Sequence, residues 1–155
     1  MPVIRARLLH ESFAPDRLFA EFLGQASNDD GAAVTFTGLA RGRNKAGERV
    51  DQLFLEHHPR LTERSLQGIA EEGAARFSVS SVDVVHRCGA IRPGEPIVWV
   101  ATASPHRRAA FEAADYLMDR LKTEALFWKR EDAANSSRWI EPTADDRSDA
   151  ARWEA

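Results

Sequence analysis

The chain has 155 residues, 43% of them hydrophobic and 29% charged, which fits one globular domain with its own core and excludes an intrinsically disordered chain. A formal net charge of -3 at pH 7 argues against a protein whose main role is to coat nucleic acid. The single cysteine excludes an internal disulfide, and no apolar stretch approaches the ~20 residues that span a bilayer, so we expect a cytoplasmic protein without a membrane segment.

The first part of the chain alternates predicted strands with a predicted helix. Residues 2–9 alternate aliphatic residues with arginines and predict a strand. Residues 14–26 carry apolar side chains at helical spacing. Short β-branched runs at 32–37 and 49–57 predict two further strands. Because they flank the basic loop 38–48, we expect them to form an antiparallel pair.

The second part contains two longer predicted helices. An apolar stripe predicts a helix over residues 61–77, and residues 79–86 and 97–103 read as strands separated by turn-forming residues. The longest predicted helix runs from about 106 to 122. Its expected apolar face consists of Phe111, Ala114, Leu117, Met118 and Leu121.

The composition changes after Glu131. Residues 132–155 are polar and acidic, with Trp139 and Trp153 as isolated anchors. We therefore expect a domain of residues 1–131 followed by an extended tail, 132–155, that packs on it only in places. The irregular order of helices and strands favours an α+β fold with a mostly antiparallel sheet over a parallel doubly wound sheet.

The start of the predicted helix at 106–122 is basic. The run Ser104-Pro105-His106-Arg107-Arg108 places a histidine and two arginines where free backbone N–H groups and the helix dipole attract anions. This pattern suits a phosphate site. A solvated basic first turn explains the same residues equally simply.

Lys122 lies four residues after Met118 and eleven after Phe111, so all three fall near one helix face. If its stem runs along apolar surface, desolvation lowers the pKa of the amine, as a catalytic lysine requires. The alternative is a lysine that extends to solvent at a helix C-terminus, where the dipole favours it.

Lys129 stands within Phe127-Trp128-Lys129-Arg130-Glu131. An aromatic wall with basic groups suits a flat heterocycle that carries phosphate, although a surface cluster beside a core tryptophan would have the same sequence. Loop cations such as Arg41 offer a phosphate clamp or a solvated loop tip. His57 and His58 lack the histidine, cysteine and carboxylate set of a zinc site, and His86 is paired only with Arg87, so no metal is predicted; Cys88 reads as a packing group. No cofactor is expected.

Several ordered segments resemble the large subunit of molybdopterin synthase, the MoaE family. They are Gly31-Ala32-Ala33-Val34-Thr35-Phe36-Thr37-Gly38 with Arg41, Leu55-Glu56-His57, His86-Arg87-Cys88-Gly89, Pro93-Gly94-Glu95, Ser104-Pro105-His106-Arg107 with Phe111, Leu121-Lys122, Phe127-Trp128-Lys129-Arg130-Glu131 and Arg138-Trp139. Each segment alone is weak. Their order and spacing across residues 30–140 make the resemblance specific.

The resemblance implies a fold and a reaction. The fold is an α/β hammerhead-like single domain, dimeric at the centre of a heterotetramer. The reaction places two sulfurs on cyclic pyranopterin monophosphate to give the dithiolene of molybdopterin. The sulfur arrives as a thiocarboxylate on the C-terminal Gly-Gly tail of a ubiquitin-like small subunit, so the large subunit needs no nucleophilic cysteine. The strongest rival is a non-catalytic module that binds a nucleotide or RNA in the same basic pocket.

The resemblance also implies roles for particular residues. Lys122 would be the principal catalytic residue, as a general acid/base or through a transient covalent link, and Lys129 the second essential lysine. The residues implied to bind substrate are Leu39, Ala40, Arg41, His106, Arg107, Lys122, Lys129, Arg130 and Glu131. Leu39, Ala40 and Leu126 depart from the usual pattern of the family, which is polar or basic, valine and proline at these positions respectively.

The distance along the predicted helix constrains how one site is assembled. His106 and Lys122 are sixteen residues apart, which is ~24 Å on a straight helix. One small pterin cannot contact both in the same chain. We therefore expect a site shared across a dimer, with His106 and Arg107 supplied by the second copy.

Overall fold

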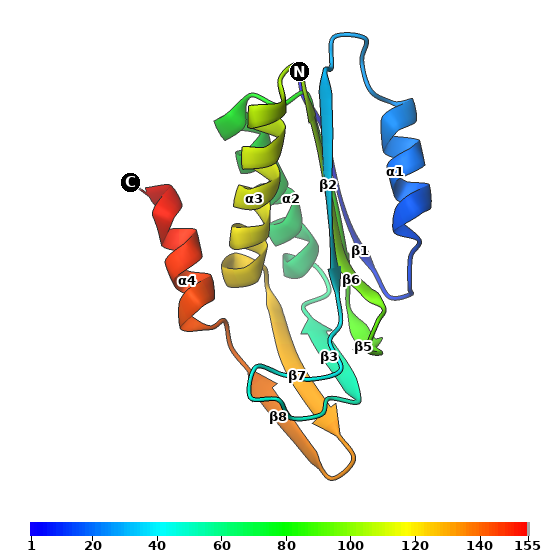
Figure 1. Cartoon of the computed structure of the whole chain (residues 1–155), viewed down its shortest axis with the longest axis vertical. Helices are drawn as coiled ribbons and strands as arrows, with labels where there is room; N and C mark the ends of the chain where they lie inside the picture. Colours follow the sequence, from blue (N-terminus) through cyan, green and yellow to red (C-terminus); the bar gives the residue numbers. More distant parts are fainter. Residues whose placement is uncertain (155) are drawn as a thin grey trace.

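The computed structural model describes residues 1–154, which form two four-stranded sheets and four α-helices (Figure 1). The helices are α1 (Pro15–Gly24), α2 (Leu61–Phe77), α3 (Arg107–Glu124) and α4 (Ala144–Ala151), followed by a 3₁₀ turn (Arg152–Glu154). The strands are β1 (Val3–Leu9), β2 (Ala32–Leu39), β3 (Gln52–His57), β4 (Ser81–Arg87), β5 (Gly89–Ile91), β6 (Pro96–Ser104), β7 (Phe127–Ala133) and β8 (Ser136–Ile140). The expected α+β class is confirmed.

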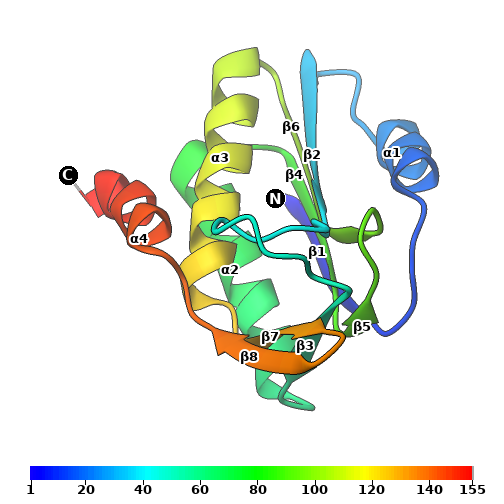
Figure 2. The ribbon, with the colours of Figure 1, turned by 60° about the horizontal axis from the view of Figure 1, so that its bottom comes forward.

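The first sheet has the strand order β1-β4-β6-β2. β1 runs parallel to β4, with Leu9 opposite Arg87, and the other neighbours are antiparallel. Helices α2 and α3 cover one face and α1 covers the other (Figure 2). β4 is buried along nearly its whole length because it is central and covered on both faces.

Two cores hold the helices to this sheet. On the face under α2 and α3, the largest fully buried side chains include Leu66 and Leu117, which pack against valines of β4 and β6. On the opposite face, Phe22 of α1 meets Trp99 edge to face, with ring centroids 6.2 Å apart. Both helical layers are therefore anchored by apolar burial.

The second sheet has the order β5-β3-β7-β8, is wholly antiparallel, and extends from one end of the first (Figure 1). Its small core contains Ala40, Leu55 and Ile91, all buried. Within residues 1–154, no helix is long and apolar enough to cross a membrane.

The expected pairing of the strands at 32–37 and 49–57 is wrong. β2 pairs with β6, whereas β3 pairs with β5 and β7, and a lone bridge between Arg43 and Arg49 links the two sides of the loop. The N–H of Ala40 donates to the carbonyl of Glu95, and that of Gly94 donates to the carbonyl of Ala40. These bonds hold the segment after β2 on the turn between β5 and β6. The chain therefore continues from the first sheet into the second instead of turning back to pair with β2.

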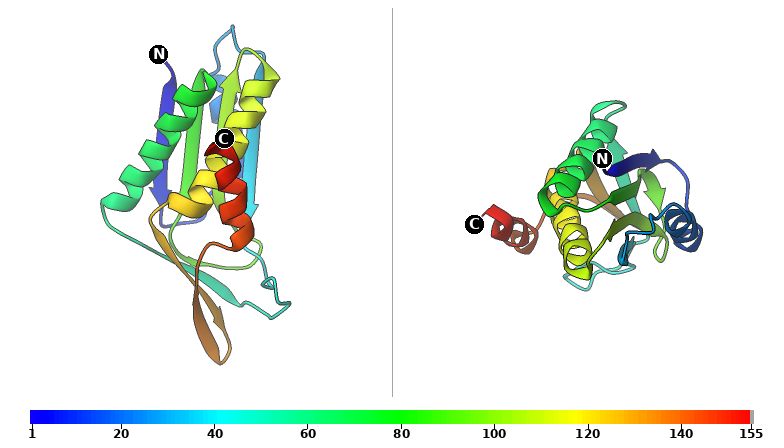
Figure 3. Two further views of the ribbon diagram at one scale, coloured as in Figure 1. Left: turned by 90° about the vertical axis from the view of Figure 1, so that its left-hand side faces the viewer. Right: turned by 90° about the horizontal axis from the view of Figure 1, so that it is seen from above.

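The expectation of an extended C-terminal tail is also wrong. β8 pairs with β7 as a hairpin, and α4 begins with a capping box in which Thr143 and Asp146 bond each other's backbone N–H. Trp153 does act as an anchor, packing edge to face on Phe77 and Tyr116. The red helix α4 lies beside α3 (Figure 3). The position between Glu131 and Asp132 lies inside β7.

The expected apolar face of α3 is correct except at Phe111. Leu117 and Leu121 are buried, but the side chain of Phe111 is 61% exposed. Six residues at ~100° each place Phe111 about 120° from Leu117 around the helix, away from the sheet. Phe111 and Lys122 do share a face, separated by only about 20°, but this face is directed to the outside.

The start of α2 is tied to the start of β7 through one buried hydroxyl. Thr62 Oγ1 accepts the N–H of His58 at 2.8 Å and donates to the carbonyl of Leu126 at 2.6 Å. Thr62→Val keeps the shape but leaves both backbone groups without this partner, which should lower the free energy of unfolding by about 1–3 kcal/mol in denaturant titrations. Thr62→Ser keeps the hydroxyl and serves as the control. A valine variant more stable than the serine variant would contradict this role.

Candidate functional site

Lys129 occupies the middle of the second sheet. It lies on β7 opposite Leu55 of β3 and Ile140 of β8. Leu55 is fully buried, and Lys129 itself is half-buried although it carries an amine. Strands on both sides therefore define the position of this lysine.

The surroundings of Lys129 disfavour its charged form. Burial, reinforced by repulsion from Lys122, lowers the pKa of Lys129 to about 8, and the carboxylate of Asp146 only partly opposes this shift. Near pH 8 about half of such amines are neutral. An amine in this range can both accept and donate a proton, as general acid–base catalysis requires.

The second lysine comes from the last turn of α3. Lys122 is exposed, and the expectation that its stem is buried against apolar surface is wrong. The burial expected for Lys122 falls on Lys129 instead. The reason is that the face of α3 shared by Phe111 and Lys122 is turned away from the core.

His86 is a neighbour of both lysines, although its sequence segment was not expected to contribute to the site. Its ring is buried and stacks on Phe127, with centroids 4.1 Å apart. Burial lowers the pKa of His86 to about 3, and the charges of Lys129 and Lys122 act in the same direction. Its Nδ1 bonds the carbonyl of Arg87 at 2.9 Å, which requires the proton on Nδ1 and leaves Nε2 as an acceptor. His86 is therefore a neutral imidazole.

Asp146 of α4 supplies a negative charge to the same region. Burial raises the pKa of Asp146, but its hydrogen bonds with Thr143 and the charges of Lys122 and Lys45 outweigh that effect and leave the pKa below its usual value. Lys45 Nζ also approaches Thr143 Oγ1 at 3.4 Å. Asp146 was expected in an extended tail, but it lies in the first turn of α4. We call His86, Lys122, Lys129 and Asp146 the lysine cluster.

The neighbours of Lys129 on β7 are committed to other contacts. Arg130 forms a two-point ion pair with Asp132, with N–O distances of 2.6 and 3.0 Å, and its guanidinium lies over the rings of Phe54 and Trp139.

Glu131 accepts a hydrogen bond from Arg138 at 3.1 Å and one from Asn44 at 3.4 Å. Arg130 and Glu131 therefore adjoin Lys129 in sequence but hold the hairpin and the neighbouring loop in place.

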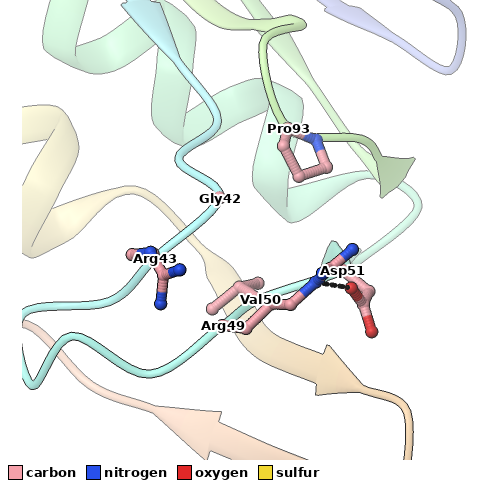
Figure 4. Close-up of a pocket in the computed structure, with 6 residues that line it drawn as sticks. All are labelled: Gly42, Arg43, Arg49, Val50, Asp51 and Pro93. Atoms are coloured by element: carbon pink, nitrogen blue, oxygen red, sulfur yellow. Dashed lines mark hydrogen bonds and ion pairs between the residues drawn. The ribbon is translucent and has the colours of Figure 1, made fainter.

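The loop after β2 lies beside the second sheet. Leu39 is 55% exposed, Ala40 is buried with its backbone N–H and carbonyl bonded, and Arg41 is exposed at the start of the loop. Farther along, Arg43 and Arg49 line an open pocket shown in Figure 4. This pocket is a separate feature from the lysine cluster, and its Arg49 is paired with Asp51 at 2.8 Å. The remaining lining residues are Gly42, Val50 and Pro93.

His106 and Arg107 lie at the opposite end of α3 from Lys122. His106 is the N-cap residue and Arg107 the first helical residue, and both are exposed. The sixteen intervening steps correspond to ~24 Å along the continuous helix. One chain therefore presents two cationic surfaces, the lysine cluster and the start of α3, that a single small ligand does not bridge.

Comparisons with known proteins agree on one family. The family described as MoaE protein matches residues 8–124. The chain is 47% identical to the molybdopterin synthase catalytic subunit of Caulobacter vibrioides over 95% of each chain. It is 46% identical to that of Escherichia coli over 81% of this chain and 83% of the relative. The solved structure of molybdopterin cofactor biosynthesis protein E from Burkholderia multivorans superposes with a TM-score of 0.81 at 34% identity, over 99% and 98% of the two chains.

The proximity of Lys122 and Lys129 can be tested by titrating the two side chains. The chain has three lysines, so their NMR signals after isotope labelling are few and can be assigned by substitution. We expect Lys129 to titrate near pH 8. Lys122→Met removes a repelling charge and should raise the pKa of Lys129, whereas Lys122→Arg keeps the charge and should leave it nearly unchanged. A Lys129 signal that titrates near 10.5 in all three proteins would contradict the proximity.

Proposed function

The chain belongs to the MoaE protein family, and from this premise we propose that it is the large, catalytic subunit of a molybdopterin synthase. Its place in metabolism would be molybdenum cofactor biosynthesis, in the cytoplasm. The observation that carries the proposal is the half-buried Lys129 with a pKa of about 8 beside Lys122. Both lysines stand in segments that define the resemblance to the family.

The proposed reaction moves sulfur from a partner protein to a pterin. A ubiquitin-like small subunit presents a C-terminal Gly-Gly thiocarboxylate, and cyclic pyranopterin monophosphate receives the sulfur. In each of two transfers, a bond forms between sulfur and a substrate carbon while a carbon–oxygen bond at that carbon breaks, and the oxygen departs as water or stays on the phosphate. The bond from sulfur to the tail's carbonyl carbon breaks, and an oxygen from water replaces the sulfur there. Because the partner brings the sulfur, the buried thiol of Cys88 has no role as nucleophile.

The two lysines would have different roles in the reaction because their surroundings differ. Lys129, with its lowered pKa, suits the transfer of protons to and from the reacting groups. Lys122 is exposed at the end of α3 and is the more accessible of the two to an incoming tail and its anionic terminus. The neutral Nε2 of His86 offers an acceptor without adding to the positive charge.

We propose that substrate phosphate is held by Arg41 together with His106 and Arg107 from a second copy of the chain. The separation along α3 supports this arrangement, because His106 and Lys122 of one copy lie at opposite helix ends. The resulting assembly is a homodimer with a small subunit on each copy. The remaining members of the implied substrate set, Leu39, Ala40, Arg130 and Glu131, would shape the site rather than contact charge.

Removal of either lysine should abolish most of the sulfur transfer. In a mixture with thiocarboxylated small subunit and cyclic pyranopterin monophosphate, Lys122→Ala and Lys129→Ala should each reduce dithiolene formation by roughly 10²-fold or more. Arg64→Ala changes an exposed residue of α2 and should retain activity. It serves as the control for activity lost during preparation of a variant. No dithiolene from the unaltered protein, or full activity in both lysine variants, would overturn the proposal.

A shared site predicts complementation between two inactive chains. Copies carrying His106→Ala and copies carrying Lys122→Ala should each be nearly inactive alone. When they are unfolded together and reassembled, the mixed dimer contains one intact site, so about a quarter of the unaltered activity should return if the chains pair at random. No recovery despite demonstrated mixed dimers would contradict a site built from both copies.

A further inference from the structure

Three side chains with metal-binding atoms meet where the two sheets join. Cys88 lies between β4 and β5, His10 follows β1, and His57 ends β3. Their potential ligand atoms all lie within 4.8 Å of one another. These residues are outside the lysine cluster, and the proposed sulfur transfer uses none of them.

The strand registers explain why these residues converge. Leu9 is opposite Arg87 in the parallel pair of β1 and β4, so the next residues of both strands, His10 and Cys88, emerge side by side. The N–H of Cys88 donates to the carbonyl of Leu9 at 2.9 Å and fixes this approach.

On the other side of Cys88, β5 pairs with β3 in antiparallel register. Gly89 stands opposite Leu55, so the end of β3 runs back toward Cys88 and brings His57 with it. The group is therefore a consequence of backbone pairing in both sheets.

The spacing of the atoms suits tetrahedral coordination. Cys88 Sγ lies 3.4 Å from His10 Nδ1. In a tetrahedral zinc site with Zn–S ≈ 2.3 Å and Zn–N ≈ 2.0–2.1 Å, sulfur and nitrogen ligands stand about 3.5 Å apart. The rings of His10 and His57 are 5.1 Å apart and nearly perpendicular, so they do not stack and can converge on one point.

The three side chains differ in their exposure to solvent. Cys88 is fully buried, His57 is half-buried and His10 is exposed. A cation therefore has a dry inner wall at the sulfur and an open side toward solvent. That open side leaves room for a fourth ligand such as water, the arrangement of zinc sites with three protein ligands.

A nucleophilic role for the same thiol fits less well. Burial raises the pKa of the Cys88 thiol and outweighs the opposing charge of Arg87. An activated cysteine instead has a lowered pKa and a thiolate at neutral pH. A thiophilic cation stabilises the thiolate by coordinating it, so the thiol proton is released on binding and the affinity rises with pH.

We propose that His10, His57 and Cys88 bind one Zn²⁺ ion, with water as the fourth ligand and release of the thiol proton. The ion joins the end of β1, the end of β3 and the junction of β4 with β5. It thereby links the first sheet to the second, which carries Lys129. The sequence-based expectation of no metal weighed His57, His58 and His86 and left out His10, which is 78 residues from Cys88 along the chain.

Cobalt substitution tests the site directly. Cys88 is the chain's sole cysteine, so any thiolate-to-cobalt charge-transfer band must come from this position. We expect untagged, metal-free full-length chain to bind one equivalent of Co²⁺ with that band and with visible absorption typical of tetrahedral coordination. One equivalent of Zn²⁺ should displace the cobalt and raise the Tm, because the ion binds the folded state.

Substitutions at each ligand separate the site from surface binding. Cys88→Ser should remove the charge-transfer band and the Tm increase. His10→Ala, at an exposed position that tolerates change, and His57→Ala should each weaken binding at least tenfold. His58→Asn is the matched control, because the Nδ1 of His58 already accepts the N–H groups of Arg60 and Leu61, and it should leave affinity unchanged.

Three results would overturn the proposal. They are the absence of a thiolate band in the unaltered chain, an affinity unaffected by both His10→Ala and His57→Ala, and a loss in His58→Asn as large as that in His57→Ala. The test does not involve the pterin or the small subunit, so it stands or fails independently of the proposed function.

Discussion

The pairing of β7 with β3 and β8 holds the amine of Lys129 partly out of water beside a second cation, Lys122. Each strand fixes the register of Lys129, and Asp146 from α4 offsets part of the cost. A pKa lowered from 10.5 to about 8 corresponds to a folding penalty on the order of 3 kcal/mol below pH 8, which is relieved as pH rises from 8 towards 10.5. The sign follows because the unfolded chain binds this proton more tightly. The free energy gained by packing elsewhere in the fold must therefore outweigh this penalty at Lys129.

The two sheets differ in the size of the hydrophobic core that each contributes to. The first sheet is buried between α1 on one face and α2 and α3 on the other, and it holds most of the fully buried side chains. The second has a small core and carries Lys129. The residue before β7 is bonded to Thr62 of α2, and the segment after β2 is held by the backbone of Ala40 on the turn before β6. Lys129 thus sits on the sheet with the smaller core, which is joined to the more deeply buried one.

Much of the fold follows from periodicity in the sequence, and the failures have physical causes. The long helices and the strands of the first sheet follow from apolar stripes and β-branched runs. The pairing of β2 with β6 does not, because local alternation specifies a strand but not its partner. Helical spacing correctly grouped Phe111 with Lys122 but could not tell which face meets the sheet. Asp146 and His86 were missed since their relation to Lys129 depends on contacts between distant segments.

The dependence of kcat/KM on pH in the reconstituted sulfur transfer tests whether Lys129 transfers protons, because it reports ionisations of the free enzyme. We expect an ionisation near pH 8 that disappears or moves well above that value in Lys129→Arg, whose guanidinium does not titrate in this range. A profile without an ionisation between about pH 7 and 9, or one that keeps it unchanged in Lys129→Arg, would contradict the assignment of proton transfer to Lys129.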